Sequence, residues 1–131
     1  MYYISIRYKP IKLLIMKKLF YHGTSLDNLN KIIESGKLKS MFEGIYFTDS
    51  VESAVRWQIP KIIGKGSPDV PETKFAVIVV ELDENDVEPG MDHSPMMNKL
   101  FGVGESYLYI KGDIPAIKFN EILEVQIELN I

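Results

Sequence analysis

Three short segments of the chain place polar or aromatic side chains at the edge of apolar runs. They are Phe20–Ser25, Gly44–Trp57 and Glu105–Tyr109. In the first segment His22 is followed by Gly23, which pairs an imidazole with a backbone that a flat ligand can approach closely, because glycine has no Cβ. A ring that carries an amide group would suit such an edge.

The second and third segments add an aromatic wall and a carboxylate. Tyr46 stands in an apolar strand-like run, and Ser53 and Trp57 are four residues apart, a spacing that places two side chains on one helix face. These three residues predict an aromatic slot with a hydroxyl at its mouth. Glu105 precedes Tyr107 after a glycine-flanked turn, where its carboxylate can accept hydrogen bonds from a ligand hydroxyl.

Each of these residues also has a structural interpretation. His22 can be a satisfied structural histidine, Tyr46 and Trp57 can be core aromatics, and Glu105 can be a solvated turn residue. Two histidines and no cysteine do not indicate a zinc site, so we expect no metal. His93 lies directly between Asp92 and Ser94, whereas the members of a hydrolase triad come from distant segments.

The length and composition are those of one globular domain. The chain has 131 residues, 46% hydrophobic residues and a net charge of −3, which argues weakly against a broad nucleic-acid footprint. We expect a single domain over residues 16–131, preceded by residues 1–15 as either an N-terminal extension or an extra strand. The apolar run Leu13–Met16 is too short to span a bilayer, and the lack of cysteine fits a reducing compartment. We therefore expect no membrane partner and a cytoplasmic location, in the host cytoplasm if the source is viral.

Periodicity and turn residues predict two helices near the front of the chain and mostly strands behind them. Ser25 is placed to cap a helix that Gly36 ends, and Asp49 and Ser50 are placed to cap a second helix that runs to about Gln58. Strands are predicted at 19–22, 45–48, 75–82, 107–110 and 122–129, loops at 61–73 and 83–104, and one helical turn at about 96–100. This order predicts an α+β domain with a bent or split antiparallel sheet.

These segments together resemble a known family. From about Leu19 to Leu129 the chain resembles the catalytic domain of ADP-ribosyltransferases of the poly(ADP-ribose) polymerase and diphtheria-toxin type, whose signature is His, Tyr and Glu on three strand segments. The stretch His22–Thr24 is similar to the family's His-Gly-Ser or His-Gly-Thr motif, and Gly44–Ala54 to its Gly-Ile-Tyr-Phe strand and following helix. Glu105 resembles the catalytic Glu, although Ser106 stands where an aromatic residue commonly follows, which leaves open a register that differs by one residue.

The resemblance implies that NAD is the substrate. It implies that the Gly23 backbone and the Ser53 hydroxyl hold the nicotinamide amide, and that Tyr46 and Trp57 form the two aromatic walls. It further implies that His22, with Thr24 beside it in the motif, binds the adenosine ribose, and that Glu105 binds the 2′-hydroxyl of the nicotinamide ribose. The catalytic residues implied by the resemblance are Glu105, His22 and Tyr46. Glu105 would act on the ribose, because a carboxylate beside the ribose stabilises an oxocarbenium ion.

The implied activity is mono-ADP-ribosylation of a macromolecular acceptor, protein or nucleic acid, with release of nicotinamide. The small size resembles stand-alone bacterial, archaeal or viral members of the superfamily. Two alternatives share the fold. One is an NAD-dependent RNA 2′-phosphotransferase, which needs basic residues around the cleft, where Arg56, Lys61 and Lys65 are near in sequence. The other is a non-catalytic module that binds ADP-ribose, nucleic acid or a host protein.

Overall fold

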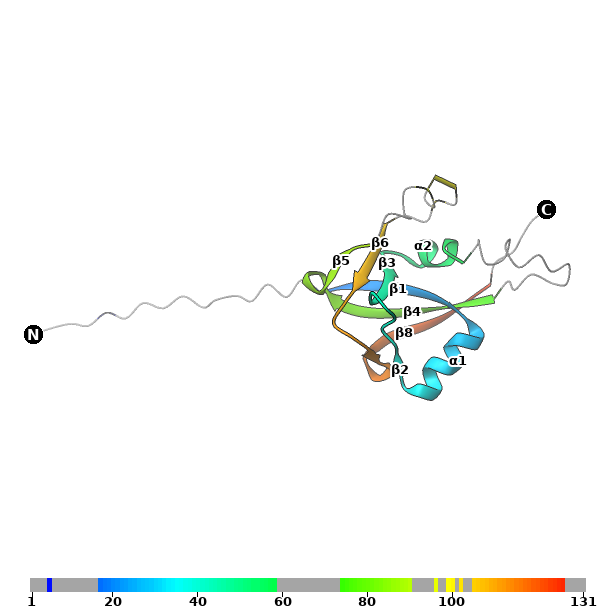
Figure 1. The fold of residues 1–131 in the computed structure, drawn as a ribbon, viewed down its shortest axis with the longest axis horizontal. Helices are drawn as coiled ribbons and strands as arrows, with labels where there is room; N and C mark the ends of the chain where they lie inside the picture. Colours follow the sequence, from blue (N-terminus) through cyan, green and yellow to red (C-terminus); the bar gives the residue numbers. More distant parts are fainter. Residues whose placement is uncertain are drawn as a thin grey trace, which may run out of the picture.

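In the part of the chain that the structure describes, the fold is a six-stranded antiparallel sheet with α1 on one face and α2 on the other (Figure 1). The computed structural model describes residue 5 and residues 17–58, 74–90, 96, 99–100, 102 and 105–126. The order of strands in the sheet is β5-β6-β3-β1-β4-β8, and β2 and β7 form a separate two-stranded sheet. Mixed helix and antiparallel sheet confirm the predicted α+β class.

The elements follow one another from β1 to β8 along the chain. The strands are β1 Lys17–Ser25, β2 Lys37–Leu38, β3 Ile45–Thr48, β4 Lys74–Asp83, β5 Val87–Pro89, β6 Ser106–Tyr109, β7 Ile114–Pro115 and β8 Phe119–Gln126. The helices are α1 Leu26–Ser35 and α2 Val51–Arg56, and the 3₁₀ turns are η1 Glu84–Asp86 and η2 Ala116–Lys118.

Both predicted helices are present, and local signals explain their ends. Ser25 accepts a hydrogen bond from the backbone N–H of Asn28, and Gly36 ends α1 at φ 76°, a left-handed conformation that glycine adopts without a steric penalty. Ser50, rather than Asp49, caps α2, and this helix ends at Arg56, two residues before the predicted end.

Strand β4 is the centre of the sheet. Residues Phe75 to Val80 are all buried, as expected for a continuous apolar run covered on both faces. Pairing with β4 extends β1 to nine residues, beyond the predicted 19–22, because its partners run from Asp83 back to Phe75. On the other side of β4, β8 starts at Phe119, three residues before its predicted start, and the residues after Gln126 lie outside the described part.

The two faces of the sheet carry separate apolar clusters. One cluster contains Phe20, Phe47 and Ile78 and is covered by α1 through Leu29 and Ile32. The opposite cluster contains Ala54 of α2 packed on Val77 and Val79, with Tyr21 and Leu123 at its side. Successive residues of a strand point to opposite faces, so Phe20 belongs to the first cluster and Tyr21 packs against the second.

The seam between β1 and β3 is the point at which the sheet opens. Within the described residues, these neighbouring strands pair at one position, Tyr21 with Thr48, whereas β1 and β4 pair along the whole of β1. The strands β3, β6 and β5 therefore form one half of the sheet and β1, β4 and β8 the other.

Some sequence predictions fall outside the described residues. These are the extension or extra strand at 1–15, of which Ser5 alone is described, and the loop 61–73. Met96, Lys99 and Leu100 are helical, as predicted for that turn, while the residues between them are not described. The predicted irregular stretch after Asp83 contains η1 and the edge strand β5. Across the ranges that the structure describes, no helix has the length and apolar character needed to cross a membrane.

Candidate functional site

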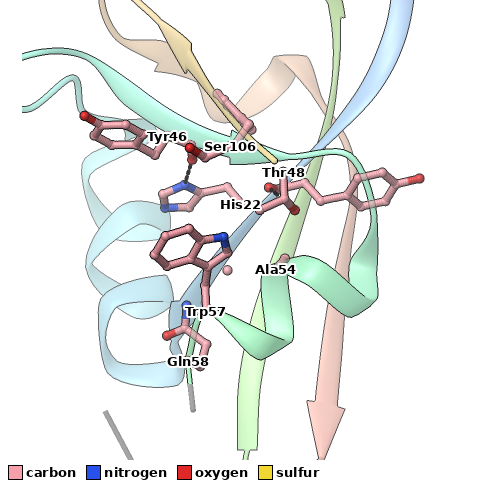
Figure 2. A pocket seen from close by; sticks show the side chains of 10 residues that line it. His22, Tyr46, Thr48, Ala54, Trp57, Gln58 and Ser106 are labelled. Atoms are coloured by element: carbon pink, nitrogen blue, oxygen red, sulfur yellow. Dashed lines mark hydrogen bonds between the residues drawn. The ribbon is translucent and has the colours of Figure 1, made fainter. Parts of the chain in front are cut away.

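A cavity of about 260 Å³ opens where β1 and β3 diverge, on the side of the sheet that α2 covers (Figure 2). Its lining combines strand residues on one side with the end of α2 on the other. The lining residues are Tyr21, His22, Gly23, Tyr46, Phe47, Thr48, Ala54, Trp57, Gln58 and Ser106. Four residues predicted from the sequence, His22, Gly23, Tyr46 and Trp57, therefore meet in one cavity.

A hydrogen bond across the opening fixes the imidazole of His22. Its Nδ1 lies 2.7 Å from the backbone carbonyl oxygen of Tyr46, so Nδ1 carries the proton and donates. The ring also meets the edge of Phe47, with 5.8 Å between centroids and 65° between planes. In the neutral imidazole Nε2 is therefore the nitrogen that can accept a hydrogen bond.

Gly23 is required by packing. A Cβ on Gly23 would lie 2.6 Å from the backbone oxygen of Ala54 and 2.9 Å from Nε2 of Gln58, and real Cβ atoms essentially never come that close to another atom. The absence of a side chain thus lets β1 approach the last turn of α2. The Cβ direction of Gly23 is therefore filled by α2 and Gln58, while Gly23 itself lines the cavity.

Tyr46 lies at the rim of the cavity and is 38% exposed. Its hydroxyl donates to the carboxylate of Glu43, and this hydrogen bond, with burial and the charge of Glu43 adding to it, raises the pKa of Tyr46 above its ordinary value. In Figure 2 the imidazole of His22 lies between the phenol of Tyr46 and the indole of Trp57. Tyr46 and Trp57, which the sequence predicted as the two aromatic walls, both line the cavity, and His22 lies between them in this view.

Two buried polar atoms of residues that line the cavity lack a hydrogen-bond partner among the residues that the structure describes. Nε1 of Trp57, a donor, and Oε1 of Gln58, an acceptor, are both buried and unpaired among the described residues. Gln58 as a whole is only 4% exposed. Sequence reasoning missed Gln58, because a polar residue just after a helix usually faces solvent.

The hydroxyl of Ser53 is hydrogen-bonded to a neighbouring side chain of the protein. Ser53 is buried, and its Oγ accepts a hydrogen bond from Oγ of Ser50 at 3.0 Å, while the N–H of Ser53 donates to the same Ser50 oxygen. Ser53 does not line the cavity. Trp57 keeps helical backbone angles as the C-cap of α2, and its N–H donates to the carbonyl oxygen of Ser53, so the predicted spacing of the two residues is present although Ser53 does not reach the cavity.

Glu105 lies beside the cavity but outside its lining. Its carboxylate accepts a hydrogen bond from the hydroxyl of Tyr107 at 3.2 Å, and Tyr107 packs edge-on against Phe20 in the α1-side cluster. Burial first, and then the hydrogen bond to Glu105, raise the pKa of Tyr107. Ser106, which pairs with Thr48, is the residue that reaches the cavity wall. The structure therefore brings together His22 and Tyr46 but turns the Glu105 carboxylate toward the other face.

A second cleft of about 470 Å³ adjoins the cavity and shares His22 and Tyr46 with it. It also contains Thr24, which is buried and does not line the first cavity. Three lysines line this cleft, namely Lys31, Lys37 and Lys39. Lys37 forms an ion pair with Asp113 at 3.1 Å. The excess of ammonium groups gives the cleft a positive character that suits phosphate.

Among the described residues, no group of three or more His, Asp or Glu side chains is arranged to hold a metal ion. Comparison of the chain with protein-family models, with curated proteins and with solved structures gives no match.

Proposed function

We propose that this protein is an NAD-dependent mono-ADP-ribosyltransferase with an ADP-ribosyltransferase-like fold, which transfers ADP-ribose to a macromolecular acceptor and releases nicotinamide. The observation that carries the proposal is the meeting of His22, Gly23, Tyr46 and Trp57 in one cavity, although they come from β1, β3 and the end of α2. Aromatic and imidazole walls suit a flat pyridinium ring.

The size of the two spaces supports a dinucleotide. A cavity of about 260 Å³ is smaller than the roughly 300–1,000 Å³ of pockets that hold drug-sized ligands, so it suits one ring and not a whole dinucleotide. The neighbouring lysine-lined cleft would hold the diphosphate, because ammonium groups bind phosphate oxygens. His22 and Tyr46 border both spaces, so His22 would lie near the sugars of such a ligand.

The chemistry requires a carboxylate near the ribose. When nicotinamide leaves, positive charge develops on the ribose, and a carboxylate beside it stabilises that charge. Glu105 directly precedes Ser106 in the cavity wall and is exposed, so its side chain has room to move. To act on the ribose it has to leave the hydroxyl of Tyr107, a single hydrogen bond of 3.2 Å.

The test is nicotinamide release from NAD, together with transfer of label from adenine-labelled NAD to a cell lysate. Glu105→Gln should lower both about 100-fold or more, the usual loss when an electrostatic stabiliser of the transition state is removed. Tyr107→Phe frees the carboxylate and should raise the rate by roughly twofold to tenfold, the equivalent of one hydrogen bond. Glu121→Gln, an exposed residue on the edge strand β8, is the matched control. Equal activity in the wild type and Glu105→Gln contradicts the proposal.

The placement of Glu105 favours a second candidate, a non-catalytic module that binds ADP-ribose or NAD. Ser106 occupies the wall position that a catalytic carboxylate would need, and a hydroxyl does not stabilise an oxocarbenium ion as a carboxylate does. Calorimetry with NAD and ADP-ribose separates the two candidates. Tight binding without nicotinamide release in the presence of lysate supports the module.

The lysine-lined cleft favours a third candidate, an NAD-dependent RNA 2′-phosphotransferase. Sequence alone offered Arg56, Lys61 and Lys65 for phosphate binding, and the structure adds the three cleft lysines beside His22. Incubation with NAD and an oligoribonucleotide that carries an internal 2′-phosphate tests this candidate. Loss of that phosphate from the RNA identifies it.

A further inference from the structure

A tight turn with two exposed apolar side chains borders the lysine-lined cleft. The N–H of Met41 donates to the carbonyl oxygen of Gly44 at 3.2 Å, so Phe42 and Glu43 stand at the tip of this turn. Met41 lines the cleft and is 64% exposed, and Phe42, the next residue, is fully exposed. Large apolar side chains that lie exposed side by side, unlike those scattered singly, are typical of an interaction site.

The segment that leads to this turn is held in place by the rest of the fold. Lys37 and Leu38 form β2, which pairs with β7, and the side chain of Leu38 is buried in the cluster under α1. The N–H of Ser40 donates to the carboxylate of Asp113 at 2.8 Å. An ordered backbone therefore presents Phe42 to solvent, and less conformational entropy is lost when a ligand packs on its ring.

The cleft beside the turn has a positive lining. Lys31 lies on α1, whereas Lys37 and Lys39 belong to the segment that leads to the turn. Side chains two residues apart in an extended chain point the same way, which explains why Lys37, Lys39 and Met41 all line the cleft. No Asp or Glu is among the described residues that line it. The ion pair of Lys37 with Asp113 is partly exposed, and such a pair is weak enough for a phosphate to compete with it.

We propose that Lys37, Lys39 and Phe42 form a binding surface for single-stranded nucleic acid, with one base stacked on the Phe42 ring and neighbouring phosphates on the two ammonium groups. Proteins bind single strands by this combination of an aromatic ring and positive charge, because every base has a flat face and every nucleotide carries a phosphate. The inference goes beyond the proposed function, since the binding requires no NAD. Lys31, on α1, is left for the diphosphate of NAD.

A protein partner and a nucleic-acid duplex fit these residues less well. Lysine is depleted in the centres of protein–protein interfaces, whereas its ammonium group binds phosphate as a point charge. The bases of a duplex are already stacked on one another, so a duplex can use the two lysines but not the ring of Phe42. A single strand uses the ring and the charges together.

The experiment is fluorescence anisotropy of the full chain, without NAD and at low salt, with single-stranded DNA and RNA of about 12 nucleotides and one sequence. The comparison ligands are the duplex of that sequence and polyglutamate of the same charge. We expect both single strands to bind more tightly than either comparison ligand. A preference for RNA or for DNA supports the surface and shows whether the 2′-hydroxyl is read. Failure of both single strands to bind, or equal or tighter binding of the duplex or of polyglutamate, overturns the proposal.

The role of the ring is tested at Phe42. Phe42→Ala should weaken single-strand binding about 5- to 150-fold, the loss of one stacked base, and should keep the midpoint of thermal unfolding because the residue is fully exposed. Phe42→Leu keeps an apolar side chain without a ring and should also bind more weakly than the wild type. The matched control is Ile117→Ala, on η2, which is 92% exposed and lies outside the cleft lining. Wild-type affinity in Phe42→Leu overturns the stacking role.

The role of the charges is tested at Lys39. Lys39→Gln removes one phosphate contact, so the slope of the logarithm of affinity against the logarithm of salt concentration should become shallower by about 0.7. The matched control is Lys17→Gln, an exposed lysine at the first residue of β1 that lies outside the cleft lining. An unchanged slope in Lys39→Gln overturns the phosphate role of Lys39.

The outcomes separate this inference from the proposed function. If single strands bind and no nicotinamide is released from NAD, the nucleic-acid surface stands and the transferase activity fails. If nicotinamide is released and no single strand binds, the activity stands and the surface fails. Phe42 lines neither the cavity nor the cleft, so Phe42→Ala should release nicotinamide at the wild-type rate.

Discussion

Replacement of Gly23 by alanine tests the contact between β1 and α2 that shapes the cavity. The new Cβ would lie 2.6 Å from the backbone oxygen of Ala54, about 0.8 Å short of the 3.4 Å at which ordinary contact begins. The clashing atom belongs to the backbone of α2, so a side-chain rotation cannot relieve it. The last turn of α2, with Trp57 and Gln58 after it, has to move away from the sheet.

Two opposing effects set the size of the change in stability. Overpacking of this kind costs typically about 1–3 kcal/mol, while replacing a strand glycine by alanine recovers roughly 0.5–1 kcal/mol of chain entropy. The clash is the larger effect, so we expect a net loss of about 1–2 kcal/mol. For a chain of this length, that corresponds to a fall of roughly 4–8 °C in the midpoint of thermal unfolding.

The assay combines urea unfolding, followed by far-ultraviolet circular dichroism, with calorimetric titration of nicotinamide. The control is Gly36→Ala, because Gly36 has φ 76° with no atom within 4 Å of its Cβ position. That substitution should cost a comparable amount, about 1 kcal/mol, through its backbone conformation alone. Gly23→Ala should lose ligand affinity and Gly36→Ala should keep it. A Gly23→Ala protein with wild-type stability and affinity would refute the argument that packing requires this glycine.

Two further predictions concern the cap of α2 and the alkaline limit of stability. Ser50→Ala removes the acceptor for the N–H of Ser53 and should lower the free energy of unfolding by about 1 kcal/mol, measured by urea unfolding; an unchanged value contradicts the cap. The raised pKa of Tyr107 means that the folded state keeps its phenolic proton at a pH where the unfolded chain has lost it, so the free energy of unfolding should decline as the pH rises above about 10. Tyr107→Phe should show a shallower decline between pH 9 and 11 than the wild type, and equal slopes contradict the assignment.

Local signals in the sequence account for the helices and the central strand. The cap Ser25 and the stop Gly36 define α1 within one short segment, and the apolar run of β4 is long enough to require cover on both faces. Strands β2, β5 and β7 have only two or three residues, too few for a period to be recognised, and tertiary pairing alone makes them strands.

Site residues that a short motif identifies could be predicted from the sequence. Site residues whose orientation depends on strand register could not. His22 and Tyr46 could be assigned from their motifs, and both border the cavity. Whether Glu105 or Ser106 faces the cavity depends on the pairing of Ser106 with Thr48, because a shift of one residue moves every side chain to the opposite face. That register is set between strands far apart in sequence, so no pattern within the segment reveals it.

In the described part of the chain, strands β1 and β3 pair at a single position, so few ladder hydrogen bonds join the two halves of the sheet. Within the described residues, Tyr21 and Thr48 are the only register pair that joins its two halves, while all nine residues of β1 pair with β4. The ladder therefore contributes little across this seam, and the packing of Phe20 against Phe47 and the hydrogen bond between His22 and Tyr46 join the two halves instead. Amide hydrogen exchange along the edge of β3 that faces β1 should slow once a ligand fills the cavity. The ligand would shield backbone N–H groups that have no ladder partner in β1.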